Sequence, residues 1–340
     1  MAEESGSAKK EIFGYEREVD DILQAVSKFD QGILGNVALI SDPFSGRTRL
    51  VEELKKNLGE RVTYVSFNSV MTDSSFMATL RDAREIVIMD NCHFLAMRKI
   101  GGFEQMNEFL NFITTSKKFF ITTWNTFSWT YLNAVLQIDS YFTNFVTLSP
   151  LDADNLKKIL LSRYGSQEIE FIDDSAAEER KLRFIWGCLN IKIPFSKDAY
   201  CLPWPSFELP GRLHKKKAIP AEEITFERLT RISGGNPGVA RFIWDKNIEF
   251  PTIWVSSFIE PVFDTNISTN QSFLLSIILS MEHVHYDDLA AIAGPEINIH
   301  RALFVLQKKG LIYEEDGYYA IGHEPLKSVI NYLKLNRMVW

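Results

Sequence analysis

An eight-residue segment between a predicted strand and a predicted helix carries the residue types that bind phosphate. It reads Ser-Asp-Pro-Phe-Ser-Gly-Arg-Thr over residues 41–48, beside the P-loop pattern G-x-x-x-x-G-K-[ST]. Such a loop needs backbone N–H groups at a helix N-terminus, one cation, and a hydroxyl group for Mg²⁺. Gly46 and Thr48 match the pattern, whereas Ser41 replaces its first glycine and Arg47 replaces its lysine. An ordinary strand–turn–helix is the alternative interpretation.

The replaced residues change what this loop can bind. Arg47 keeps the positive charge but not the compact ammonium group of lysine, so phosphate would be held in a different geometry. Asp42 places a negative charge where anions are to bind. We predict that Thr48 is a magnesium ligand and that the nucleotide contacts come from consecutive residues, namely Pro43, Phe44, Ser45, Gly46, Arg47, Thr48 and Arg49.

Polar residues end two later predicted strands. Asp90 ends the apolar run 85–90, in the place of the aspartate that holds Mg²⁺ in P-loop ATPases; a carboxylate that caps a loop is the alternative. Asn91 follows, where active ATPases usually carry an acid, and asparagine can position water but cannot accept its proton. Asn125 ends the next strand and would face a γ-phosphate, although asparagine is common in turns. These three residues are the predicted catalytic positions, together with Arg241.

The segment 234–241, Gly-Gly-Asn-Pro-Gly-Val-Ala-Arg, is the fourth element of the predicted site. Asn236 is a good helix N-cap and Pro237 a good first helical residue. Arg241 lies one turn inside the helix, where its side chain could point back toward a phosphate. The alternative is a solvated helix arginine.

Hydrophobic periodicity predicts strands that alternate with helices in the first half of the chain. The strands are expected at 36–40, 62–67, 85–90, 118–123 and 145–148, and the helices at 16–29, 46–58, 103–115 and 129–139. Such alternation indicates right-handed βαβ units and a parallel sheet, so the fold class is α/β. After Pro150 helices are expected at 152–164, 173–189, 222–232 and 237–246. Five prolines make 193–220 an extended insertion without regular helix or central strand.

The C-terminal part has a different pattern. Helices are expected at 271–281 and 286–293, with a third that opens at Pro295 and ends at Gly310, followed by a hairpin over 311–321. This order looks like a winged helix. Residues 270–323 contain three basic and seven acidic residues, three of them at the tip of the hairpin. Because such a tip would repel DNA phosphates, we expect the winged helix to contact protein, with DNA binding as the alternative.

The motifs together resemble a known family. Residues 13–18, Phe-Gly-Tyr-Glu-Arg-Glu, are similar to the F-G-R-E-x-E entry of AAA+ and STAND-type archaeal ATPases and origin-recognition proteins, with Tyr15 in place of its arginine. The other motifs follow in that family's order over roughly residues 11–250. The resemblance implies binding of ATP or ADP with Mg²⁺, the metal being held by Thr48 and Asp90. It further implies Walker A at 41–48, Walker B at Asp90, sensor 1 at Asn125, sensor 2 at Arg241, and an adenine contact from Phe13, Gly14 and Tyr15.

The chain also departs from that family. No lysine or arginine lies between Lys118 and Lys157, so the arginine finger expected after sensor 1 is absent. With Ser41, Arg47 and Asn91 also altered, several catalytic parts differ. The prediction is nucleotide binding with weak or no hydrolysis, which leaves open whether the protein is an ATPase at all.

Composition limits the remaining possibilities. The 340 residues are 46% hydrophobic and 24% charged, with a net charge of −7 and three cysteines without paired spacing. No apolar run approaches the roughly 18 residues that a membrane span needs, and the N-terminus lacks the apolar stretch of a signal peptide. We therefore expect a cytoplasmic protein with reduced thiols and no membrane insertion. His283, His285, His300 and His323 match no standard set of metal ligands.

The expected organisation is a flexible tail at 1–10, a P-loop α/β domain at 11–150, a helical lid domain at 151–265 and a winged-helix domain at 266–340. We predict a nucleotide-dependent switch or scaffold that signals through the winged helix to a protein partner. Two alternatives stay open: an active ATPase that acts on DNA like the origin-recognition proteins or loaders, and a pseudo-NTPase interaction module. The partner, the process and the oligomeric state are left undetermined.

Overall fold

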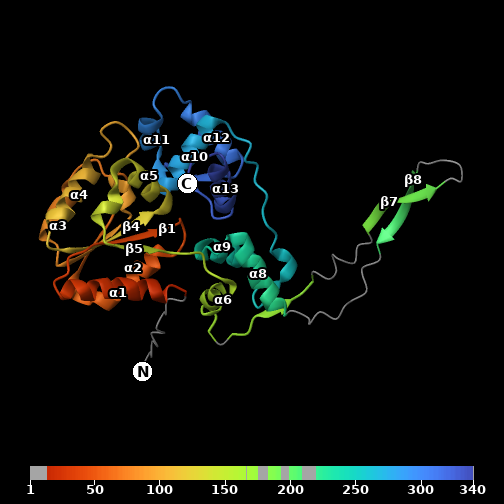
Figure 1. Ribbon diagram of the computed structural model, residues 1–340, viewed down its shortest axis with the longest axis horizontal. Helices are drawn as coiled ribbons and strands as arrows, with labels where there is room; N and C mark the ends of the chain where they lie inside the picture. The colour runs from red at the N-terminus through yellow and green to blue at the C-terminus, as the bar shows by residue number, and fades with distance from the viewer. Residues whose placement is uncertain (1–13, 166, 175–182, 193–198, 209–219, 340) are drawn as a thin grey trace.

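The computed structural model describes residues 14–165, 167–174, 183–192, 199–208 and 220–339 (Figure 1). Phe13 and the predicted tail at 1–10 lie outside these residues. In the described part of the chain, no helix is both long enough and apolar enough to cross a membrane.

A parallel five-stranded sheet forms the first half of the molecule. Its order is β2-β3-β4-β1-β5, and every pairing is parallel. The strands are β1 Val37–Ser41, β2 Val62–Ser66, β3 Ile86–Asp90, β4 Phe119–Asn125 and β5 Asn144–Thr147. The helices that connect them are α1 Glu16–Asp30, α2 Arg47–Leu58, α3 Ser75–Asp82, α4 Glu104–Thr115 and α5 Thr126–Leu136. The predicted α/β class, with a P-loop NTPase-type sheet, is confirmed.

Burial of the strands follows their position in the sheet. Every residue of β1, β3 and β4 is buried, whereas β2 and β5 at the two edges are partly exposed. This explains why the inner strands read as continuous apolar runs, since helices cover both faces of a parallel sheet. Because the strands are parallel, their carboxyl ends meet at one edge, where Ser41 pairs with Asn125 and β3 ends at Asp90.

A helical region follows the sheet. It consists of α6 Ala153–Leu161, α8 Ala221–Ser233 and α9 Pro237–Asn247, with a short parallel pair of strands, β6 Glu170–Ile172 and β9 Thr252–Trp254. Stacked rings of Phe226 and Trp244, 5.2 Å apart, join α8 to α9 in its core.

One prediction between these helices is wrong. Residues 183–189, expected to be helical, belong to the strand β7 Arg183–Lys192, which pairs antiparallel with β8 Ala199–Glu208. β8 lies within the predicted extended insertion, and as one strand of a two-stranded hairpin it is compatible with the expected lack of a central strand there. Aromatic and β-branched residues in β7 favour a strand. Because Pro203 and Pro205 are two residues apart, their backbone nitrogens point toward the same edge of β8. Proline has no N–H group to donate, and a two-stranded hairpin tolerates it at an outer edge, where no further strand pairs.

The C-terminal unit, residues 266–339, ends the chain. Its order is α10 Thr269–Met281, β10 His283–His285, α11 Tyr286–Ala293, α12 Ile299–Lys308, β11 Ile312–Glu315, β12 Tyr318–Ile321 and α13 Leu326–Leu335. The expected three helices and hairpin are present, and β10 joins the hairpin in a sheet of order β10-β12-β11. α12 begins at Ile299 rather than Pro295, because the side chain of Asn298 caps it through Arg301 N.

The C-terminal unit packs against the sheet region through α10. Figure 1 shows α10 beside α5, and α10 also contacts the short 3-10 helix η2 Cys92–Leu95 that follows β3. Ser128 Oγ in α5 donates a 2.6 Å hydrogen bond to Ser280 O near the end of α10. This contact brings the C-terminal end of α10 to the carboxyl edge of the sheet.

Candidate functional site

The loop between β1 and α2 is a tight turn that leads into the N-terminus of α2. Phe44 and Gly46 have φ values of 63° and 92°, and glycine adopts such values without a steric cost. The loop is closed by Ser45, whose hydroxyl group donates to Asp42 O at 2.7 Å. Ser41, which replaces the first glycine of the motif, is fully buried and accepts a hydrogen bond from Arg47 Nη1 at 3.3 Å.

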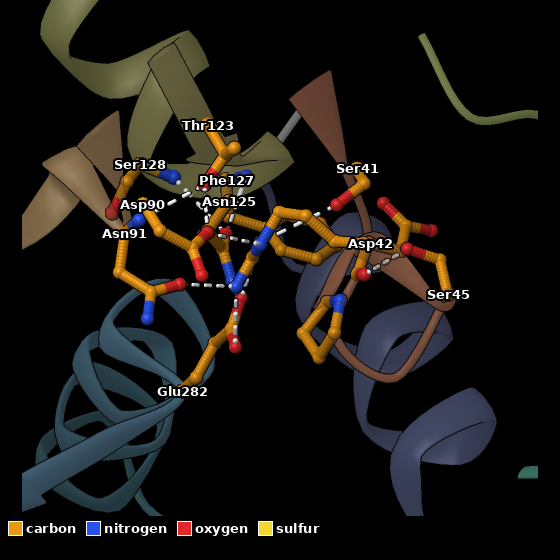
Figure 2. A network of polar contacts seen from close by, with 12 residues as sticks. Ser41, Asp42, Ser45, Asp90, Asn91, Thr123, Asn125, Phe127, Ser128 and Glu282 are labelled. Carbon is orange, nitrogen blue, oxygen red and sulfur yellow. Dashed lines mark hydrogen bonds and ion pairs between the residues drawn. The ribbon is translucent and has the colours of Figure 1, made fainter. Parts of the chain in front are cut away.

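Arg47 is the centre of a buried polar cluster, the Arg47 clamp, which comprises Arg47, Asp90, Asn91, Asn125 and Glu282 (Figure 2). Only 8% of Arg47 is exposed. Its Nη2 donates to Asn91 Oδ1 at 2.7 Å and to Glu282 Oε2 at 3.0 Å, while Nη1 lies 2.9 Å from Glu282 Oε1. The guanidinium therefore forms a two-pronged ion pair with Glu282.

Arg47 and Glu282 stabilise each other in their charged forms. Burial alone lowers the pKa of Arg47, but the carboxylates of Glu282 and Asp90 outweigh it and the pKa is raised. Burial also raises the pKa of Glu282, but the adjacent Arg47 prevails and lowers it to about 2. At neutral pH both groups are charged, and the cation of the loop is already neutralised by an anion of the same chain.

Asp90 and Asn91 use their polar atoms within the protein. Asp90 is 3% exposed and accepts hydrogen bonds from Thr123 Oγ1 at 2.5 Å and Tyr64 Oη at 3.1 Å. Asn91 has a φ of 61°, a value that asparagine tolerates better than most residues. Its Oδ1 accepts from Arg47, and its Nδ2 donates to Phe67 O at 3.2 Å. Both amide atoms of Asn91 therefore already take part in hydrogen bonds within the protein.

Asn125 joins the sheet to the C-terminal unit. Its Oδ1 caps α5 by accepting from Phe127 N and Ser128 N, at 2.8 and 3.3 Å. Its Nδ2 donates to Leu279 O at 3.0 Å and to Glu282 Oε1 at 3.2 Å. The predicted sensor position thus contacts α10 and its following residue.

Glu282 was missed by the sequence analysis. It follows the last residue of α10, has a φ of 64°, and lies 235 residues beyond Arg47. The sequence contained one signal. The C-terminal end of a helix carries a partial negative charge that favours cations, so an acid at the end of an apolar helix is in an unfavourable position. Such a residue needs a compensating partner, but local sequence does not reveal that the partner is Arg47.

The N-terminus of α9 covers the same loop from the other side. Gly238 N donates to Phe44 O at 2.9 Å, and Asn236 Nδ2 donates to Pro43 O at 2.7 Å. A Cβ atom at Gly238 would lie 2.5 Å from Phe44 O, so only glycine permits this approach. The ring of His323 stacks on Phe44 at 4.0 Å. The loop therefore packs against both α9 and the segment that follows β12.

The remaining predicted residues lie in different surroundings. Tyr15 is 5% exposed, donates to Ser149 O at 3.2 Å and has its pKa raised by burial. Gly14 is adjacent, with its N–H donating to Glu16. Thr48 is exposed in the first turn of α2, and Arg49 in that turn is half-buried. The structure thus places Tyr15 beside Gly46 of the loop, Gly14 against Leu151 and Asn155, and Thr48 on the surface.

Arg241 is not brought to the clamp, contrary to the expected orientation toward phosphate. Its side chain is 63% exposed and its Nε lies 3.7 Å from Asp245 Oδ2, one turn further along α9. The reason is that α9 meets the loop through the backbone and side chain of its first residues, which leaves position 241 on the outer face. Its surroundings are those of a solvated helix arginine.

As arranged, these residues do not fit a nucleoside triphosphate with Mg²⁺. A phosphate beside Arg47 would meet the carboxylate of Glu282, and both oxygens of Asp90 already accept hydrogen bonds. Within the described ranges, no group of three or more histidine, cysteine or acidic residues could hold a metal ion. Binding of ATP or ADP with Mg²⁺ stays a prediction, and it requires a rearrangement of the clamp.

A comparison of this structure with solved structures finds several proteins with a similar arrangement of the chain. A RuvB variant from Thermotoga maritima is 14% identical, with 94% of this chain and 95% of that chain covered and a TM-score of 0.45. Aeropyrum pernix ORC2 in ADPNP and ADP complexes is 11% identical, with 96% of each chain covered and a TM-score of 0.44. Drosophila ORC bound to DNA is 12% identical, with 97% and 89% covered and a TM-score of 0.44.

No protein-family model and no curated protein matches the chain. At these identities and TM-scores, the similarity carries no conclusion about function. The chain's own parallel sheet and the turn between β1 and α2 define an α/β fold of the P-loop NTPase type. At that turn, Ser41 and Arg47 replace the glycine and lysine of the P-loop pattern.

Proposed function

We propose that this protein is a P-loop-fold scaffold or switch that does not hydrolyse nucleotide and that presents its C-terminal unit to a protein partner. One observation carries the proposal: the carboxylate of Glu282 from the C-terminal unit forms a two-pronged ion pair with Arg47 of the loop, at 2.9 and 3.0 Å. The motif that binds phosphate in P-loop enzymes holds two parts of this chain together instead.

The surroundings of the clamp support the absence of hydrolysis. Activation of water needs an acid or a water-orienting group, and Asn91 has both amide atoms engaged with Arg47 and Phe67. The charge that develops during phosphoryl transfer needs a free cation. Arg47 is neutralised by Glu282, and Arg241 lies on an exposed face beside Asp245.

The outer face of the C-terminal unit supports a protein partner. With its helices and antiparallel sheet in this order, we interpret the unit as a winged helix in which α12 corresponds to the recognition helix. Phe304 on α12 and Tyr313 on β11 are 64% and 43% exposed, respectively. Large exposed aromatic side chains of this kind are typical of protein interfaces.

Charge argues against DNA on the same face. Glu314, Glu315 and Asp316 at the hairpin are all exposed, where they would repel phosphates. Lys309 at the end of α12 is paired with Asp264, which reduces the positive charge that this helix offers. We expect no salt-sensitive duplex binding by the full chain in fluorescence anisotropy at physiological ionic strength. Sub-micromolar binding that weakens with added salt would favour the DNA-loader alternative.

ATP turnover by the purified full chain tests the proposal most directly. We expect turnover far below about 1 s⁻¹, the lower end of normal enzymatic rates, whether or not ATP or ADP binds in calorimetry. Glu282→Gln, which removes the charge that neutralises Arg47, should leave turnover equally low because Asn91 is unchanged. Glu315→Gln, which removes a similar charge from the exposed hairpin, is the matched control.

Two results would change the conclusion. Turnover of about 1 s⁻¹ or faster by the unaltered protein would show a working ATPase and contradict the proposal. Binding of Mg-nucleotide without turnover, with higher affinity in Glu282→Gln than in Glu315→Gln, would establish the nucleotide-dependent form of the switch. In that case Glu282 would be the group that nucleotide displaces.

A further inference from the structure

A small cavity lies beside the Arg47 clamp but is not part of it. Its lining includes His93 and Arg98 from the segment after β3, Ser128 and Tyr131 from α5, and Met281 at the end of α10. The cavity measures about 210 Å³ out to its mouth. Its enclosed part has room for about one water-sized group.

His93 contributes polar atoms that lack partners. The residue is 1% exposed; the backbone of Met281 lies near its ring, but neither ring nitrogen forms a hydrogen bond of normal distance and angle with any of the described residues. Burial lowers the pKa of His93 to about 3, so at neutral pH the ring is uncharged and has one N–H donor. Buried polar atoms without partners are rare and costly, and they indicate that another group is needed to satisfy them.

Arg98 contributes a charge without a matching anion. Its guanidinium lies 4.0 Å from the ring centroid of Tyr131, and no ion pair with a carboxylate of the described chain is present at this residue. Burial lowers the pKa of Arg98, with Tyr131 acting in the opposite direction, but an arginine stays charged at neutral pH. A desolvated cation is stabilised by a hydrogen-bonded anion.

We propose that this cavity binds the carboxylate group of a small organic acid, with Arg98 as its counter-ion and the His93 N–H as a second donor. A planar guanidinium matches a planar carboxylate through parallel hydrogen bonds. The enclosed part has room for one carboxylate oxygen, with the remainder of the acid toward the mouth, and it excludes a base or a sugar. A water molecule alone would satisfy His93 but would leave the charge of Arg98 unpaired.

Binding at this cavity would act on the clamp. Met281, one wall of the cavity, directly precedes Glu282, and Ser128 on the opposite wall hydrogen-bonds Ser280 O. The cavity is complete only while α10 is docked, so a bound carboxylate favours the docked state. This consequence rests on the proposed function, whereas the binding itself does not.

Histidine NMR of the full chain tests the site, with acetate as the probe. The protein contains six histidines, and with ¹⁵N-labelled histidine the signal of His93 is identified by its loss in His93→Gln. Acetate replaces chloride at constant ionic strength. We expect a saturable shift of the His93 signal, and an apparent affinity at least about tenfold weaker in Arg98→Gln, which loses the charge-assisted hydrogen bonds. Arg81→Gln, which removes an exposed charge from α3, should not change the affinity.

Other outcomes overturn the proposal. A His93 signal that does not respond to acetate shows that the cavity holds water only, and a response that is equal in Arg98→Gln shows that Arg98 is not the counter-ion. A response to inorganic phosphate but not to acetate contradicts the carboxylate assignment. If Arg98→Gln does not fold, Arg98→Lys replaces it, and its weaker single-point charge should still lower the affinity. ATP turnover is measured independently, so failure here is distinct from failure of the proposed function.

Discussion

Arg47 and Arg241 were both predicted to face phosphate, and the structure places them in opposite surroundings. Arg47 is 8% exposed and contacts Glu282 and Asn91 at 2.7–3.0 Å. The Arg241 side chain is 63% exposed and has Asp245 at 3.7 Å. An exposed ion pair contributes little to stability, whereas loss of one partner from a buried pair leaves an uncompensated charge. The role of an arginine therefore depends more on the anion that it contacts in the folded protein than on its position in a sequence motif.

The largest effect is expected for Arg47→Met. This change leaves the carboxylate of Glu282 beside that of Asp90 with no cation between them, and we expect the free energy of unfolding to fall by about 3 kcal/mol. Urea denaturation monitored by tryptophan fluorescence measures it. Arg241→Met on the outer face of α9 is the control, with an expected change within about 0.5 kcal/mol.

A double-mutant cycle measures the coupling between Arg47 and Glu282 directly. Glu282→Gln added to Arg47→Met removes the unpaired carboxylate, so it should recover a large part of the lost stability. Independent additive losses from the two changes would show that the pair is not coupled. If Arg47→Met and Arg241→Met lower the free energy of unfolding equally, the two arginines do not differ in their contribution to stability.

A smaller effect is expected from pH. The pKa of Glu282 is lowered from 4.5 to about 2 in the folded protein, so the unfolded chain binds this proton more readily. The contribution of the group to the free energy of unfolding is complete above about pH 4.5 and is lost as pH falls toward 2. The unfolding free energies of the unaltered protein and Glu282→Gln, measured from pH 6 to pH 2, should converge over this window.

The comparison between the two proteins removes the contributions of acid-sensitive groups that do not interact with Glu282. A constant difference between the unaltered protein and Glu282→Gln from pH 6 to pH 2 would show that Glu282 is not held in its charged form by Arg47. Glu315→Gln on the exposed hairpin should show no such pH-dependent difference, since it lacks a buried partner.

Much of the sheet could be predicted because its signals are local. The apolar run that ends at Asp90 and the run that ends at Asn125 are inner strands, and Gly46 marks the start of α2. The hairpin of β7 and β8 was missed because residues 173–189 were predicted to be helical; the prolines exclude only a central strand, and β8 is one strand of a two-stranded hairpin. Pro295 was taken as a helix start, whereas the cap is Asn298.

The candidate site, like the fold, could be predicted only in part. The motifs placed Arg47, Asp90, Asn91 and Asn125 at one edge of the sheet, because parallel strands bring their carboxyl ends together. They did not indicate that Arg241 faces away, since its direction depends on how the N-terminus of α9 packs against the loop. The polar neighbours of each side chain are set by packing between elements rather than by spacing along the chain.

By itself, the sequence determined the parallel sheet, the turn around Gly46 and the lack of an acid at position 91, where the family that the motifs resemble usually has one, since these depend on local pattern and residue type. Only the tertiary structure decided what neutralises Arg47. Glu282 reaches it from 235 residues away because α10 docks on α5 and directs the residue after its last turn into the edge of the sheet. A buried cation requires an anion, but only the arrangement of the two units in space determines which anion supplies it.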